Sequence, residues 1–191
     1  MQHSAVHSLA EITAEIEGTQ KPGRVLHILG VLQSSLALAE LYNVDAEKAA
    51  RAALLHDCAK HYDREQTMEL YKSGKIKLAE EDLDYPALWH GPVGAWLAKT
   101  RFGITDADVL DAVEHHTLGH ADPSPLLQVI MCADYTEPTR TQPGVQELRV
   151  AVRNNLRTGL LAVLDAKIEE IIAKGQKPHS RIYETKKSLE K

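Results

Sequence analysis

The stretch that decides the fold is Ala49-Ala-Arg-Ala-Ala-Leu-Leu-His-Asp-Cys-Ala-Lys60. Apolar side chains recur in it and just before it at intervals of three and four residues, at Ala46, Ala49, Ala50, Ala53 and Leu54. This spacing predicts a helix with one buried face. The run ends in His56-Asp57, and a buried Asp is costly unless it is paired or bound to a metal. Because His and Asp together suit a divalent transition metal, the stretch predicts a polar site at the end of a buried helix.

The His56-Asp57 step alone is a weak signal, because this dipeptide occurs by chance in many chains. The alternative is an Asp that caps a turn beside a partly buried His. The choice depends on whether similar side chains lie on or beside other apolar helical faces. Four further positions meet that condition: His27, His90, His116 and Asp134.

Each of these four positions also has an ordinary explanation. His27 can be a His at a core margin, bonded to a backbone carbonyl, and His90 can be a simple cap at a helix start, although free N–H groups there also favour an anion. Asp134 lies in the last turn of an apolar helix, where a carboxylate opposes the helix dipole unless a cation is near. One of His115 and His116 is expected to point inward, and the sequence leaves open which one.

Composition limits the class of protein. The chain has 191 residues, 43% hydrophobic and 26% charged, which predicts one domain. A net charge of −5 and a pI near 6.0 give no reason to expect nucleic-acid binding. Cys58 and Cys132 lie in apolar runs, which favours a reducing compartment over a disulfide framework. We see no secretory signal and no apolar stretch approaching the roughly 18 residues of a membrane span, so we expect a cytoplasmic protein without a membrane partner.

The apolar periodicity predicts helices along most of the chain and no strands, so the expected fold class is all-α, a single helical bundle. The residues expected to lie on the buried stripe of the second helix are Val25, Ile28, Leu29, Leu32, Leu36 and Ala39. Residues 176–191 form a charged tail that is expected to fray. Outside the opening stretch, the expected helices are residues 8–17, 22–41, a short one near 68–71, 91–102, 107–116, 126–135 and one long helix over 145–172.

Six motifs extend the pattern His…His-Asp…His…His…Asp: Arg24-Val-Leu-His27, Ala53-Leu-Leu-His-Asp-Cys-Ala-Lys60, His90-Gly-Pro-Val-Gly-Ala95, Glu114-His-His-Thr-Leu-Gly119, Ala133-Asp-Tyr-Thr-Glu-Pro-Thr-Arg140 and Gly144-Val-Gln-Glu-Leu-Arg149. The pattern resembles the HD-domain phosphohydrolase superfamily, and the motifs resemble most closely its YqeK-type symmetrical bis(5′-nucleosyl)-tetraphosphatases. They cover most of residues 22–180 in the same order. Two departures, Trp89 before His90 and a looser tail after His179, affect no proposed ligand.

The resemblance implies a single HD domain over residues 1–191, with its core at about 20–175 and a polar tail at 176–191. It implies hydrolysis of diadenosine tetraphosphate to two ADP, with Asp57, Lys60 and His90 as catalytic residues. One metal ion would be held by His27, His56, Asp57 and Asp134, while His90 and His116 would complete a second metal position or contact the phosphates. The residues expected to contact the substrate are Arg24, His27, Lys60, His90, His116, Thr117, Gly119 and Arg140.

The resemblance suggests iron as the cofactor, although the ligand types alone also admit manganese, cobalt or zinc, as one or two ions. Such ions lower the pKa of bound water towards about 7 and neutralise phosphoryl oxygens. Two alternatives stay open: an HD-type nucleotidase or alarmone phosphohydrolase that shares the metal site, and a non-catalytic nucleotide- or metal-binding module. The breadth of nucleotide specificity and the oligomeric state, a homodimer included, are also left open.

Overall fold

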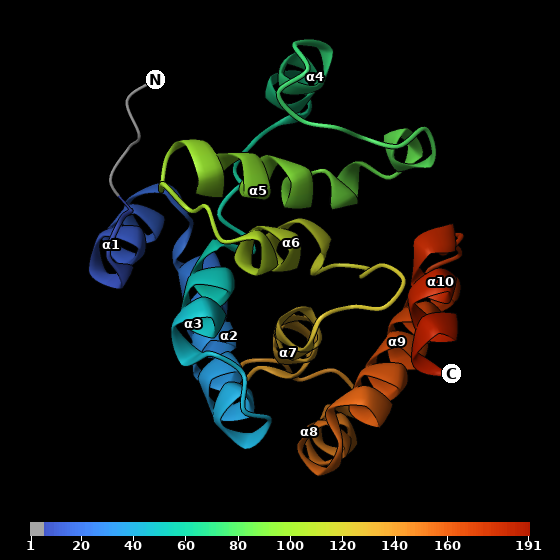
Figure 1. Cartoon of the computed structure of the whole chain (residues 1–191). Helices are drawn as coiled ribbons and strands as arrows, with labels where there is room; N and C mark the ends of the chain where they lie inside the picture. The colour runs from blue at the N-terminus through green and yellow to red at the C-terminus, as the bar shows by residue number, and fades with distance from the viewer. Residues whose placement is uncertain (1–5) are drawn as a thin grey trace.

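The protein is all-α, as predicted: in the computed structural model, which describes residues 6–191, these residues form ten α-helices and two short 3₁₀ segments and no strand (Figure 1). Residues 1–5, on which the expected absence of a secretory signal partly rests, lie outside the described residues. The helices are α1 (Leu9–Thr19), α2 (Pro22–Leu41), α3 (Ala46–Leu55), α4 (Arg64–Lys72), α5 (His90–Thr100), α6 (Ala107–His115), α7 (Pro125–Thr136), α8 (Val145–Asn154), α9 (Leu156–Ala173) and α10 (Ser180–Leu189). The 3₁₀ segments are Glu81–Asp84 and Pro86–Leu88.

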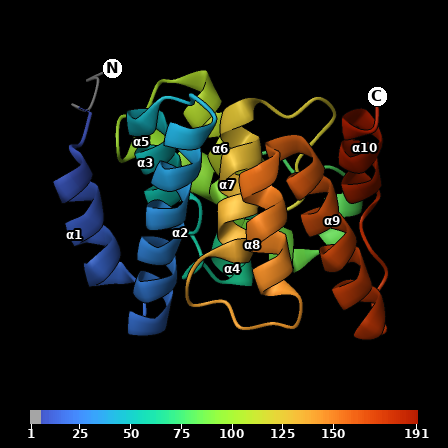
Figure 2. The same ribbon diagram turned by 90° about the horizontal axis from the view of Figure 1, so that it is seen from below.

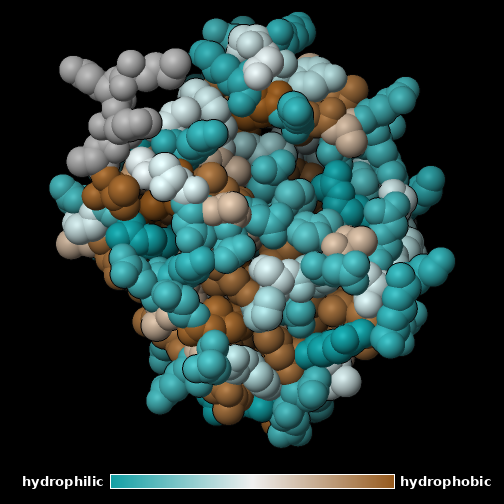
Figure 3. Space-filling model, in the orientation of Figure 1, coloured by the Kyte–Doolittle hydropathy of each residue, from teal (hydrophilic) through white to brown (hydrophobic). Residues whose placement is uncertain are grey.

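Helix α7 is the centre of the bundle. It contacts α2, α3, α6, α8 and α9, and nine of its residues are buried, as expected of a helix that is apolar on all sides. Seen from below, α2, α7, α8 and α9 stand side by side (Figure 2). Helices α4 and α5 lie at the top of Figure 1, α6 lies between α5 and α7, and α3 lies to the left of α7. The face drawn in Figure 3 is mostly hydrophilic, with apolar patches between the polar side chains.

Side-chain caps mark the starts of α3 and α6. The side chain of Asp45 accepts a hydrogen bond from the Lys48 N–H at the start of α3, and Asp106 does the same for Val109 in α6. Such side chains satisfy N–H groups that have no partner inside the helix. Helix α3 ends at Leu55, so His56 and Asp57 stand in the turn just beyond it.

The long helix expected over residues 145–172 is wrong, because the chain forms α8 and α9 instead. At Asn155 the backbone is extended, with φ −159° and ψ 123°, and its side chain accepts a hydrogen bond from Thr158 N at 3.0 Å. Asn competes for backbone partners in this way and therefore favours helix starts over helix interiors. The apolar residues keep their helical spacing across Asn155, so the sequence pattern does not reveal that the helix ends there.

The C-terminal tail does not fray, contrary to expectation. Residues 180–189 form α10, which packs on α9. Ile182 is fully buried, and Thr185 Oγ1 donates a hydrogen bond to the Leu118 carbonyl at 2.8 Å. Arg181 also pairs with Asp82 at 2.8 Å. Because these few apolar contacts are made to distant parts of the chain, they are invisible in a segment whose composition is mostly charged. Ile12 of α1 is fully buried too, so the core extends beyond residues 20–175 at both ends.

The buried face of α2 includes Ile28 and Ala39 of the predicted stripe but is rotated away from Leu29 and Leu36. Leu29 and Leu36 are 37% and 39% exposed, whereas His27, Val31 and Ser35 face the interior. Apolar residues occur on every side of this helix, so their spacing does not define one face. By length and composition alone, α2 also passes as a membrane span, which corrects the expectation that no stretch comes close. In the fold, its inner face packs against α3 and α7, as in the core helix of a bundle.

Candidate metal centre

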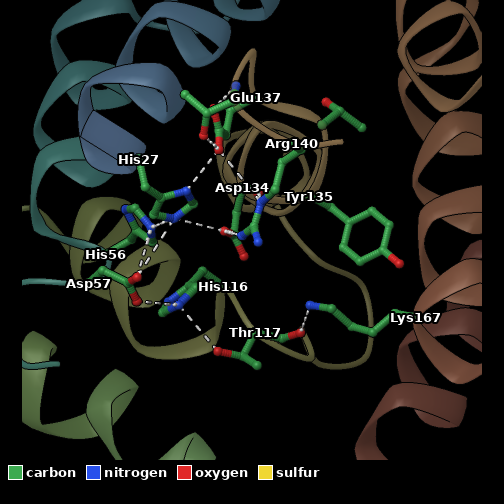
Figure 4. A network of polar contacts seen from close by, with 12 residues as sticks. His27, His56, Asp57, His116, Thr117, Asp134, Tyr135, Glu137, Arg140 and Lys167 are labelled. Carbon is green, nitrogen blue, oxygen red and sulfur yellow. Dashed lines mark hydrogen bonds and ion pairs between the residues drawn. The ribbon is translucent and has the colours of Figure 1, made fainter. Parts of the chain in front are cut away.

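Five helices bring the predicted ligands to one place, and all of these ligands except His90 are labelled in Figure 4. His27 comes from the second turn of α2, His56 and Asp57 from the end of α3, His90 from the start of α5, His116 from the end of α6, and Asp134 from α7. The four imidazoles and Asp57 are buried. Gly91 lets α5 approach α6 closely, because a Cβ there would lie 2.2 Å from the Glu114 carbonyl oxygen.

Asp57 lies between two pairs of imidazoles and presents a different oxygen to each pair. Its Oδ1 lies 3.2 Å from His90 Nε2 and 3.6 Å from His116 Nε2. Its Oδ2 lies 3.7 Å from both His27 Nε2 and His56 Nε2. In each group of three residues, the potential ligand atoms lie within 4.8 Å of one another, so each group could hold a metal ion.

The hydrogen bonds of the imidazoles support this interpretation. His56, His90 and His116 each place Nδ1 within 2.6–2.8 Å of a backbone carbonyl oxygen, of Ala53, Ala87 and Val113 respectively. A carbonyl only accepts, so Nδ1 carries the proton, and Nε2 of the neutral ring has a free lone pair.

Two of these lone pairs point at each other, because His90 Nε2 and His116 Nε2 are 3.0 Å apart. The lone pair of His56 lies on Nε2, which is 3.3 Å from His27 Nε2. Neighbouring lone pairs that also face a carboxylate repel each other, and a bound cation would remove the conflict. Backbone carbonyls that orient metal-binding imidazoles in this way are common around metal sites. The donor set therefore fits a divalent metal.

His27 has carboxylate partners on both ring nitrogens. Nε2 lies 3.2 Å from Asp134 Oδ1, and Nδ1 lies 3.1 Å from Glu137 Oε1. Glu137 is fully buried and is held by hydrogen bonds from Thr139 N and Oγ1. Sequence reasoning missed Glu137 as a site residue. The signal was its place within the Ala133–Arg140 motif, directly after the helix that carries Asp134.

The electrostatic environment shifts the pKa values of the ligands in different directions. Burial lowers the pKa of His56 and of His90 to about 4, which keeps both rings neutral. Burial alone would raise the pKa of Asp57, but the surrounding imidazoles hold it well below its ordinary value. Burial would likewise lower the pKa of His27, but the hydrogen bonds and charges of Asp134 and Glu137 outweigh it and raise that pKa.

We expect metal affinity to depend on pH through His27. A ligand must be deprotonated to bind, so once the pH falls below the raised pKa of His27, affinity should drop by up to about tenfold per pH unit. His56 and His90 should not contribute until the pH approaches 4. Glu137→Gln removes a charge that favours the protonated ring, so the midpoint should move to lower pH. Metal titrations between pH 5 and 8 measure this midpoint, and an unchanged midpoint in the variant would contradict the assignment.

Basic side chains surround the centre. Arg24 donates to Asp57 Oδ2 at 2.5 Å, Lys60 Nζ lies 3.8 Å from Asp57 Oδ1, and Arg140 pairs with Asp134 at 2.9 Å. Lys167 of α9 donates to the Thr117 carbonyl at 2.7 Å (Figure 4). Burial lowers the pKa of Lys167. A long apolar helix pattern gave no signal for this inward-facing Lys.

The segment after α6 separates residues that the sequence grouped together. His116 faces the centre and Thr117 Oγ1 lies 3.2 Å from its Nε2, whereas His115 turns away and pairs with Asp111 at 3.0 Å. His120 also pairs with Asp111, at 3.1 Å. The structure does not bring Gly119 into the site: with φ 71° it forms a buried turn against Thr185 and Met131.

Comparisons with known proteins agree with this geometry. The HD domain family model matches residues 24–139. The symmetrical bis(5′-nucleosyl)-tetraphosphatase of Bacillus subtilis is 36% identical over 154 residues, which cover 80% of this chain and 82% of that protein. Its namesake in Halalkalibacterium halodurans is 36% identical over 155 residues, 80% and 81% of the two chains.

A solved structure has the same fold. The crystal structure of a "predicted HD superfamily hydrolase involved in NAD metabolism" from Clostridium acetobutylicum matches with a TM-score of 0.92 and 39% identity, and the match covers 97% of this chain and 98% of that one. Both the sequence relatives and the solved structure therefore extend over most of the chain. The chain belongs to the HD-domain superfamily and, within it, to the family of the symmetrical bis(5′-nucleosyl)-tetraphosphatases.

Proposed function

We propose that this chain is a metal-dependent phosphoanhydride hydrolase that cleaves diadenosine tetraphosphate symmetrically into two ADP. The observation that carries the proposal is Asp57 placed between two pairs of imidazoles, with Arg24 and Lys60 beside it. The printed names of the relatives from B. subtilis and H. halodurans support the same reaction. A polyphosphate substrate needs the concentrated positive charge that such a centre provides.

We propose that His27, His56, Asp57 and Asp134 hold one metal ion, and that Asp57, His90 and His116 hold a second. Asp57 would join the two positions, because its two oxygens face different ligand pairs. Iron is the proposed metal, with manganese, cobalt and zinc as the alternatives that metal analysis of anaerobically purified protein would separate. When bound, such ions lower the pKa of water and neutralise phosphoryl oxygens.

The remaining residues act on the polyphosphate directly. Arg24 and Arg140 are each more than a third exposed at the side chain and point into the same centre, so they can bind phosphoryl oxygens. Lys60 is the proposed catalytic cation, because its ammonium stands beside Asp57 Oδ1 and can offset charge that develops during cleavage. Thr117 and the imidazole of His116 are proposed to position the chain of phosphates.

We further propose that residues 1–191 form one HD domain and that the protein works in the cytoplasm, with a dinucleoside polyphosphate as its partner and neither nucleic acid nor a membrane. The net charge of −5 supports the absence of non-specific nucleic-acid binding. The oligomeric state, including a homodimer, is left to sedimentation or light scattering.

Product analysis tests the function. Metal-loaded protein incubated with diadenosine tetraphosphate should yield ADP as the sole nucleotide product, because cleavage at the central anhydride gives two identical halves. ATP plus AMP would contradict symmetric cleavage. Turnover of mononucleotides or a guanosine alarmone in preference to diadenosine tetraphosphate would favour the related HD enzymes. Bound metal and nucleotide without hydrolysis under any of the four metals would favour a binding module.

A further inference from the structure

Two cavities border the metal centre, and they share no lining residue. The first, of about 830 Å³, is lined by Arg24, His27, Tyr135 and Arg140 among others. The second, of about 340 Å³, is lined by Lys60, Tyr62, Arg64, Thr67, Ala87 and His90 among others. Both volumes lie in the range of cavities that hold small organic ligands, roughly 300–1,000 Å³.

The cavities correspond to the two sides of Asp57. His27 lines the first cavity and faces Asp57 Oδ2, while His90 lines the second and faces Asp57 Oδ1. Each oxygen of Asp57 therefore faces two imidazoles and one basic side chain, Arg24 on one side and Lys60 on the other. The two sides of Asp57 thus carry the same kinds of side chain, except that Asp134 and Glu137 contact His27 alone.

Basic side chains outnumber carboxylates in both cavities, with Glu137 and Glu170 as the acidic lining of the first and Asp63 as that of the second. Arg24 and Arg140 line the first cavity beside the ring of Tyr135. In the second cavity, Arg64 at the start of α4 lies over the buried ring of Trp89, with 5.9 Å between the guanidinium carbon and the ring centroid. Cations beside apolar and aromatic surface suit a nucleotide, whose phosphates are anionic and whose base is flat and largely apolar.

We propose that the second cavity, between the α3–α4 turn and the 3₁₀ segment Pro86–Leu88, is a second nucleotide half-site. It would hold one ADP half of a dinucleoside tetraphosphate while the first cavity holds the other half. With both halves seated, the central anhydride bond lies beside Asp57, which explains why cleavage is symmetric. The inference rests on the proposed function and deepens it, because it assigns the substrate's second half to particular residues.

The number of ADP molecules bound per chain tests the inference without relying on turnover. Calorimetric titration of the metal-loaded protein with ADP should give two sites per chain. Ala87→Trp, which fills the second cavity from an exposed position, should leave one site. Ala79→Trp, also exposed and absent from the lining of that cavity, is the matched control and should keep two sites. One ADP in the unchanged protein, or two in Ala87→Trp, would overturn the inference.

Kinetics provide a second readout with a milder substitution. Arg64→Ala should raise the KM for diadenosine tetraphosphate about tenfold with little change in kcat, because the lost contact binds substrate and transition state alike. Lys72→Ala, at the other end of α4, should leave KM unchanged. Equal KM values in the two variants would count against the half-site. If the unchanged protein does not cleave diadenosine tetraphosphate, the proposed function fails; if it cleaves the substrate but binds one ADP, only the half-site fails.

Discussion

Replacing Asp57 with Ala should abolish turnover and metal binding while leaving the helical fold in place. Asp57 faces all four imidazoles of the centre, so its loss removes the ligand that both proposed metal positions share. Loss of metal-supported charge stabilisation costs several kcal/mol in the transition state, which corresponds to a decrease in kcat of at least about 10³-fold. Steady-state kinetics, metal analysis and circular dichroism of the same preparation measure the three quantities.

Asp111→Asn provides the matched control. Asp111 also pairs with two imidazoles, those of His115 and His120, but this cluster is half-buried and lies outside the candidate centre. The control should keep kcat within about twofold of the unchanged protein, as expected for a surface substitution away from the reacting groups. Full activity in Asp57→Ala would refute the proposed metal centre, and equal losses in both variants would show that the effect is not specific to it.

Replacing Ile182 with Ala should destabilise the protein by about 2–5 kcal/mol, the usual range when a large aliphatic side chain is removed from a packed interior. Ile182 is fully buried, although it lies in a C-terminal segment of mostly charged composition. For a domain of this size, each kcal/mol lowers Tm by roughly 2–4 °C. Chemical denaturation and thermal melts of the variant measure the change.

The neighbouring residue serves as the control for this effect. Tyr183 lies on the same helix but is 46% exposed, so Tyr183→Ala should change stability by no more than about 0.5 kcal/mol. If Ile182→Ala is as mild as Tyr183→Ala, then α10 contributes little to the fold, and the expectation of a frayed tail would be restored.

Local signals in the sequence were sufficient for the fold class and for most helix boundaries. Caps such as Asp45 and Asp106 accept hydrogen bonds from N–H groups only three residues away. The residue that starts a helix can therefore be identified from the sequence next to that helix. Polar residues that interrupt an apolar helix face can also be identified from the sequence alone. His56 and Asp57 stood out because burial of such groups demands a partner, wherever in the chain that partner lies.

The tertiary structure decided which of the candidate side chains contact one another in the metal centre. Only the packing of α2 against α3 and α7 turns His27 inward and leaves Leu29 exposed, because an apolar period common to all sides of a helix cannot choose its face. The choice of His116 over His115, and the recruitment of Glu137, depend likewise on contacts between distant segments.

The sequence by itself therefore determined that this chain is a helical bundle, and it predicted the imidazoles and carboxylates that could share a cation. What only the tertiary structure decided was the two-sided arrangement around Asp57 and the cavity next to each side. The physical reason is that hydrogen bonds and apolar spacing within a helix act over a few residues, whereas a site built from α2, α3, α5, α6 and α7 exists only once their buried faces have packed together.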